Sequence, residues 1–199
     1  MHISEGVLSP PVLAAGWALT AGGLALGLRK TRTENLPRTA LVSSALFLAS
    51  LVHVPLGPSS IHLTLLGLAG IMLGWSSIPA LFISLLLQGL LFQFGGLLSL
   101  GVNTAVMGSA ALAGSLAFRA LPERFTLPAA FAGGFAAVIT GTVLVCAALF
   151  LSHGSLKATA ALLFAANLPL ALAEGVITLF ITAFLLKMMP AYVSRQAQL

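Results

Sequence analysis

The sequence predicts an all-α membrane protein with seven transmembrane helices, its N-terminus outside and its C-terminus in the cytoplasm. Three observations support this prediction. Of the 199 residues, 59 % are hydrophobic and only 7 % are charged, whereas soluble domains carry about 25 % charged residues. The mean hydropathy is +1.09, and apolar runs long enough to cross a bilayer follow one another along the chain. The basic residues are also unequally divided between alternate connections, which sets the orientation.

The first half of the chain predicts four of the helices. The first covers 7–28 and ends before the basic run RKTRTENLPR. The second covers 39–54 and stops at PLGPSS, where Gly and Pro favour a turn. From 61 to 94 the chain stays apolar for longer than one crossing needs. The stretch WSSIP divides it into a short helix at 61–75 and a full helix at 79–94.

The second half predicts three more helices, at 102–121, 128–151 and 162–189. They are separated by PERFTLP and SHGSLK, and QFGGLLSLG precedes the first of them. All seven form one transmembrane domain, 1–199. Merging the third and fourth helices would place Arg119 and Arg124 outside, so the six-helix alternative is rejected. Small residues at helix-packing spacing, as in Gly70-xxx-Gly74, predict close contacts between helix backbones.

The basic residues support this topology. With the N-terminus outside, Lys157 alone lies on the outer side. Eight others lie on the cytoplasmic side, as the positive-inside rule requires: Arg29, Lys30, Arg32, Arg38, Arg119, Arg124, Lys187 and Arg195. The net charge of +5 is therefore explained by membrane topology, and no nucleic-acid partner is expected.

Composition also limits the possible sites. The single Cys146 excludes a disulfide framework and a cysteine metal cluster. The chain has no Asp, which argues against a carboxylate site for a hard cation. No cleavable signal peptide is expected, because no basic region precedes the first apolar run near Val7.

The start Met-His offers three nitrogen ligands to one metal ion. The α-amine of Met1, the amide nitrogen of His2 and the His2 imidazole close a five-membered and then a six-membered chelate ring. Nitrogen ligands in a plane suit Cu(II) or Ni(II) best, and Co(II) plausibly. The alternative is an initiator methionine followed by an ordinary residue.

The predicted topology gathers the polar groups at the outer end of the helices. His53 ends the second helix and His62 opens the third, and the turn between them can aim both imidazoles at one point. For His62 the alternative is a loop histidine bonded to a backbone carbonyl. As a ligand in a loop, His62 is also expected to pack little. His153 is expected to belong to a solvated connection. The residues gathered there are Met1, His2, Glu5, His53, Ser59, Ser60, His62, Asn103 and His153.

Glu174 lies inside the seventh predicted helix. Carboxyl groups within a membrane are rare, costly and usually functional. Two alternatives stay open for this residue, namely a structural hydrogen-bonding role and a contact to a partner subunit.

Four segments, in chain order, resemble the CbiM/NikM family: MHISEGVLSP, HVPLGPSSIHL, FQFGGLLSLGVNT and LPLALAEGVITLFITAFLLK. Members of this family are the substrate-specific membrane components of cobalt and nickel energy-coupling-factor (ECF) transporters. The resemblance implies seven helices with the N-terminus tucked inward from the outer side. It also implies that Met1, His2 and His62 bind the metal, with His53, Glu5, Ser60 and Asn103 supporting the ligands or lining an entry path.

The resemblance is closer to the cobalt-type members, because nickel-type members follow the ligand histidine with Pro-Thr-Gly-Thr-Gly and this chain reads HLTLLGLAG. It implies a bacterial inner-membrane, multi-pass subunit that imports Co²⁺, or next Ni²⁺, as transported substrate and uses no cofactor. The chain contains no P-loop pattern. ATP hydrolysis is therefore expected from other chains, and the resemblance implies that the partners are a coupling transmembrane subunit, paired ATP-binding subunits and a small auxiliary membrane protein.

Two other functions are alternatives to transport. An intramembrane metalloenzyme would use His53, His62 and Glu174, but no HExxH-type pair is present. A metal-sensing receptor would need an output domain, and the tail PAYVSRQAQL is too short for one.

Overall fold

The structure is a computed structural model that describes residues 2–51, 53–56, 59–154, 157–190 and 193. For residues 53–56, 59–61 and 157–159 it describes the backbone path. Within these residues the chain is almost entirely helical, with one short β-hairpin. The all-α fold class predicted from the sequence is therefore confirmed for the described part of the chain.

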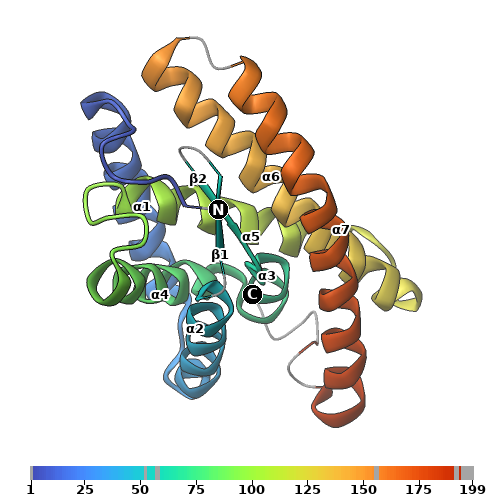
Figure 1. Cartoon of the computed structure of the whole chain (residues 1–199). Helices are drawn as coiled ribbons and strands as arrows, with labels where there is room; N and C mark the ends of the chain where they lie inside the picture. Colours follow the sequence, from blue (N-terminus) through green and yellow to red (C-terminus); the bar gives the residue numbers. More distant parts are fainter. Residues whose placement is uncertain (1, 52, 57–58, 155–156, 191–192, 194–199) are drawn as a thin grey trace.

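Seven α-helices and two strands are found in the described residues (Figure 1). Short 3-10 turns precede α2, α4 and α6. The strands, β1 (His53–Leu56) and β2 (Ser59–His62), pair antiparallel between α2 and α3. The helices are α1 (Pro10–Lys30), α2 (Leu36–Ser50), α3 (Leu66–Leu73), α4 (Ser77–Phe92), α5 (Leu100–Ala120), α6 (Thr126–His153) and α7 (Lys157–Met188).

The chain runs back and forth between two ends of the bundle. At one end, where α1 stops, the Thr31 hydroxyl donates to the Ser76 hydroxyl in the turn between α3 and α4 at 2.9 Å. At the other end, the segment before α1 bonds to Leu98 and Asn103, which lie just before and at the start of α5. The short α3 thus carries the chain from the hairpin to the Thr31 end, and α4 returns it.

Helix α5 lies at the centre of the bundle and packs against α1, α3, α4 and α6, while α7 packs along α6 (Figure 1). All eight residues of α3 are buried. The close backbone contact predicted around Gly70 is present, because a Cβ there would lie 1.9 Å from the Ala111 carbonyl oxygen of α5. A side chain at this position would push α3 away from the central helix.

The hairpin shortens two of the predicted helices. The helix predicted at 39–54 stops at Ser50, and the last residues of that range belong to β1. The helix predicted at 61–75 starts only at Leu66, and the first residues of that range belong to β2. Pro55 cannot donate a helix hydrogen bond, and the turn residues that follow favour a reversal. The fold-back predicted for PLGPSS is found, with His53 opposite His62 in the strand register.

Within the described part of the chain, five helical stretches are long and apolar enough to cross a membrane: Pro10–Lys30, Leu66–Phe92, Leu100–Ala120, Glu123–His153 and Ala160–Met188. The stretch Leu66–Phe92 contains α3, α4 and the 3-10 turn between them. Helix α2 has 15 residues, about 22 Å at 1.5 Å per residue, which is shorter than the bilayer core of about 30 Å.

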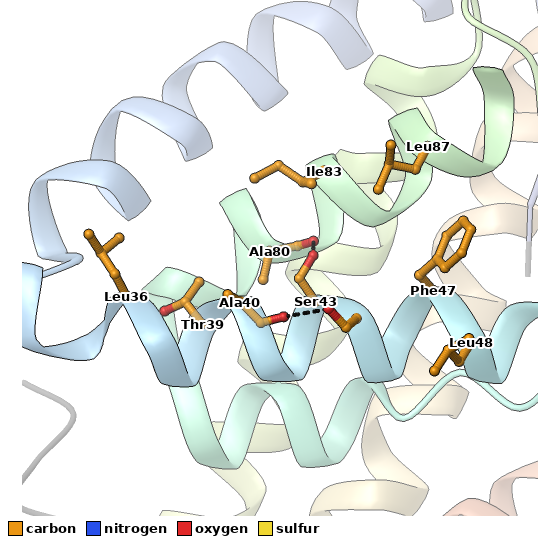
Figure 2. A pocket seen from close by; sticks show the side chains of 10 residues that line it. Leu36, Thr39, Ala40, Ser43, Phe47, Leu48, Ala80, Ile83 and Leu87 are labelled. Atoms are coloured by element: carbon orange, nitrogen blue, oxygen red, sulfur yellow. Dashed lines mark hydrogen bonds between the residues drawn. The ribbon is translucent and has the colours of Figure 1, made fainter. Parts of the chain in front are cut away.

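A groove of about 440 Å³ lies between α2 and α4. Leu36, Phe47, Ile83 and Leu87 line it, and the Ser43 hydroxyl crosses its floor to the Ala80 carbonyl at 2.9 Å (Figure 2). No histidine is among the residues that line this groove, so the groove is separate from the predicted metal ligands.

Candidate metal-binding site

The two histidines that sequence reasoning placed at the site lie together. The rings of His2 and His62 stack, with centroids 4.5 Å apart and planes inclined by 16°. Both side chains are 4 % exposed. The expectation that His62 packs little is therefore wrong, because its ring is covered by His2 and by the surrounding bundle.

One bond fixes the orientation of the His62 ring. Its Nδ1 lies 2.9 Å from the Leu63 carbonyl oxygen. A carbonyl only accepts, so Nδ1 carries the proton, and Nε2 of a neutral imidazole is then the nitrogen able to bind a metal. The two alternatives for His62 are thus compatible, since a bond to a backbone carbonyl is also what orients a ligand histidine.

Asn103 holds the backbone next to His2. Its Oδ1 accepts the Ile3 N–H at 2.8 Å, and its Nδ2 donates to the Ile3 carbonyl at 3.0 Å. Ile3 is fully buried and Asn103 is 3 % exposed. These two bonds pair the backbone N–H and carbonyl of Ile3 with the side-chain amide of Asn103. Leaving such buried polar groups without hydrogen bonds would cost free energy. Asn103 therefore supports His2 through the adjoining residue.

Glu5 fastens the same segment to the connection before α5. Its Oε1 accepts the Leu98 N–H at 3.0 Å. Gly96 has φ +93°, and a Cβ there would lie 2.5 Å from Glu5 Oε2. Only glycine fits this position, where the backbone is left-handed and the carboxylate leaves no room.

The end of α6 supplies two further contacts. His153 is exposed, in line with the sequence prediction, and its Nε2 lies 2.5 Å from the Val7 carbonyl. The Ser9 N–H donates to the Ser152 hydroxyl at 3.1 Å. Sequence reasoning missed these contacts, because the partners are separated by more than 140 residues and nothing in SHGSLK marks an anchor.

Glu174 bonds to the segment after His62. The carboxyl is fully buried in α7, and it accepts the N–H groups of Thr64 and Leu65 and the Thr64 hydroxyl. Of the two alternatives left open, the structure shows the hydrogen-bonding role within the chain.

Three candidates fall partly or wholly outside the described residues. Met1 is one, and the side chains of His53 and Ser60 are the others. Among the residues that the structure describes, no group of three or more His, Cys, Asp or Glu side chains could hold a metal. The donor set expected here differs from such a group, because it combines two imidazoles with main-chain nitrogens.

This arrangement can be compared with known proteins. A family model for the cobalt uptake substrate-specific transmembrane region matches residues 2–192, which is nearly the whole chain. The chain belongs to the CbiM family. The match includes His2, Glu5, His62, Asn103 and Glu174.

Relatives of this CbiM-family chain are transport proteins. A putative metal transport protein of Haemophilus influenzae is 39 % identical and covers 98 % of each chain. The cobalt transport protein CbiM of Sorangium cellulosum is 35 % identical over 98 % of this chain and 95 % of that one. A crystal structure of a truncated transition metal transporter superposes with a TM-score of 0.79 at 25 % identity, covering 94 % of this chain and 99 % of that one.

The CbiM-family chain is thus a multi-pass membrane protein with a role in metal transport, and it is not an enzyme. The metallo-enzyme alternative is overturned by this family membership. The Glu174 carboxyl, which the metalloenzyme would have used, instead accepts hydrogen bonds from the backbone N–H groups of Thr64 and Leu65. The metal is a transported substrate rather than a cofactor.

Proposed function

We propose that this chain is the substrate-binding subunit of an ATP-driven, ECF-type importer of a divalent transition metal, with Co²⁺ as its first substrate and Ni²⁺ as its second. The observation that carries the proposal is the buried contact between His2 and His62, made by two segments 60 residues apart in the sequence. Imidazole nitrogens select for late first-row metals over hard cations.

The metal is captured by four nitrogens. They are the α-amine of Met1, the amide and imidazole nitrogens of His2, and Nε2 of His62. The bonds of Ile3, Glu5, Val7 and Ser9 to three other parts of the chain support this assignment, since they hold the N-terminal segment in one place. Ligands held in advance lose less entropy when the metal binds. His53 and Ser60 support the ligands or line the entry path.

The bundle crosses the membrane seven times, with the histidine end outside and the C-terminus in the cytoplasm. The back-and-forth path supports this count, because α3 joins the two ends although it has only eight residues. The basic residues Arg29, Lys30, Arg119 and Lys187 all belong to last turns at the opposite end from the histidines.

Energy for import comes from other chains. The partners are a coupling transmembrane subunit, paired ATP-binding subunits and a small auxiliary membrane protein, as in the transporters that the sequence resembles. Uptake of radioactive Co²⁺ by cells should require the ATP-binding subunits, and replacing their P-loop lysine should stop it. Uptake that continues in that variant would rule out ATP-driven transport.

The decisive experiment lengthens the chain at its start. One residue added before Met1 turns the α-amine into an amide and moves the new amine out of chelate reach. Titration calorimetry with Co²⁺ should then show no binding to the extended protein, while the same addition after Leu199 leaves binding unchanged. His2→Ala should be equally damaging.

The comparison metals are Ni²⁺, whose uptake by cells should be slower than that of Co²⁺ although nitrogen ligands bind it at least as tightly, and Ca²⁺, which should not bind. Binding of one equivalent of Co²⁺ to the N-terminally extended protein would exclude the α-amine as a ligand. Faster uptake of Ni²⁺ than of Co²⁺ would reverse the order of the two substrates.

A further inference from the structure

Glu174 is a fully buried carboxyl group whose described bonds all lie on the segment that follows His62. Its Oε1 accepts the Thr64 N–H and the Thr64 hydroxyl, the latter at 2.8 Å. The Leu65 N–H lies 2.9 Å from Oε1 and 3.0 Å from Oε2. One carboxyl of α7 thus holds two consecutive backbone amides and a side chain of the β2–α3 connection.

These amides belong to a turn that needs an outside partner. Leu65 precedes the first residue of α3 and has φ +51°, in the left-handed region that a leucine rarely adopts. N–H groups at a helix start have no partner within the helix, and within a bundle in lipid water cannot replace one. The carboxyl of Glu174 supplies the missing acceptors and so keeps the turn in this conformation.

The position of Glu174 is itself fixed by helix packing. A Cβ on Gly67 of α3 would lie 2.4 Å from the Gly134 Cα of α6. A Cβ on Gly134 would lie 2.7 Å from the Glu174 carbonyl oxygen of α7. Three helix backbones therefore meet directly beside the turn, and this packing fixes the backbone position from which Glu174 extends its carboxyl.

The same turn carries the bond that orients the His62 ring. His62 Nδ1 donates to the Leu63 carbonyl, and Leu63 is the residue directly before the pair that Glu174 holds. We infer that Glu174 is a positioning residue for metal capture, which keeps the His62 imidazole against His2 by fixing residues 63–65. This inference rests on the proposed function, in which His62 is a ligand.

The test uses the purified full-length chain and Co²⁺, followed by calorimetry and by the visible absorption of the bound ion. Glu174→Gln keeps the size of the side chain but replaces one acceptor by a donor, and should weaken Co²⁺ binding about 10-fold. Glu174→Leu removes both acceptors and should weaken it towards 100-fold. In both variants the absorption band should shift, because the ligand geometry changes.

Two further variants separate positioning from general stability. Thr182→Val removes a fully buried hydroxyl two turns along the same helix and should leave both affinity and absorption unchanged. Thr64→Val removes only the hydroxyl donor to Glu174. Its effect on affinity should be smaller and should not add to that of Glu174→Gln, because the two residues share one interaction.

The outcomes distinguish the two proposals. If His2→Ala binds Co²⁺ like the wild-type protein, the proposed metal site fails. If His2→Ala abolishes binding but Glu174→Gln keeps wild-type affinity and absorption, Glu174 does not position His62. A lower melting temperature in Glu174→Gln with unchanged affinity would likewise reduce Glu174 to a purely structural group and overturn the inference.

Discussion

At the scale of single residues, His62 shows how one bond can serve two purposes. Nδ1–H donates to the Leu63 carbonyl, which satisfies a buried polar atom and leaves Nε2 as the nitrogen that binds the metal in the proposed function. The His2 ring stacks on one face of the His62 imidazole. A histidine that pairs with a backbone carbonyl is therefore not excluded as a ligand.

We predict that His62→Ala lowers Co²⁺ affinity by at least about 100-fold, more than the loss of a group that only supports a ligand. The variant should also be less stable by about 1 kcal/mol, because a stacked aromatic pair is lost. Calorimetry and a thermal melt measure the two effects. Ser44→Ala, which removes an exposed hydroxyl of α2, should leave the affinity unchanged, and equal losses in both variants would contradict a ligand role for His62.

At the scale of elements, the N-terminal segment 2–9 has no regular structure of its own. It is held by Asn103 of α5, by the connection before α5 and by the end of α6. Ile3 and Leu8 also pack into an apolar cluster with residues of α5, α6 and α7. The segment that contains His2 is therefore anchored to the bundle at several points along its length.

We predict that Gly96→Ala loosens this segment. The substituted residue would need a left-handed backbone and would meet the Glu5 side chain at 2.5 Å. Both the melting temperature and the Co²⁺ affinity should fall. Gly22→Ala in α1 is the matched control, because a Cβ there meets nothing within 4 Å and alanine favours a helix. Unchanged Co²⁺ affinity in Gly96→Ala would show that Glu5 and its neighbours do not hold the site.

At the scale of the whole molecule, alternate connections lie at opposite ends of the bundle. The residues around His2 and His62 occupy one end, and the contact of Thr31 with Ser76 marks the other. In the proposed function this separates the end that captures the metal from a basic end, and we propose that the basic end faces the cytoplasm, as the positive-inside rule predicts.

We predict that cysteines at the two ends are labelled from opposite sides of the membrane. In a Cys146→Ser background, Thr33→Cys should react with an impermeant maleimide only in inverted vesicles, and Leu97→Cys only in intact cells. Both positions are exposed in the structure. Labelling of both from the same side would contradict the seven-crossing path, and the reverse pattern would contradict the orientation.

The amino-acid sequence by itself determined the helical membrane class. It also predicted a metal chelate formed by the Met-His start and one further histidine. It could do so because hydrophobicity, charge asymmetry and chelate geometry depend on composition and on covalent neighbours. The sequence extended two helices too far into residues 51–65, where the structure has the β-hairpin, since a short apolar run does not distinguish a strand from a helix. Only the tertiary structure decided that His62 is buried against His2, that Asn103 and Glu5 hold the N-terminal segment, and that Glu174 bonds to Thr64 and Leu65. These contacts join residues from about 60 to 110 positions apart, and such pairs are set by helix packing, which local sequence patterns do not encode.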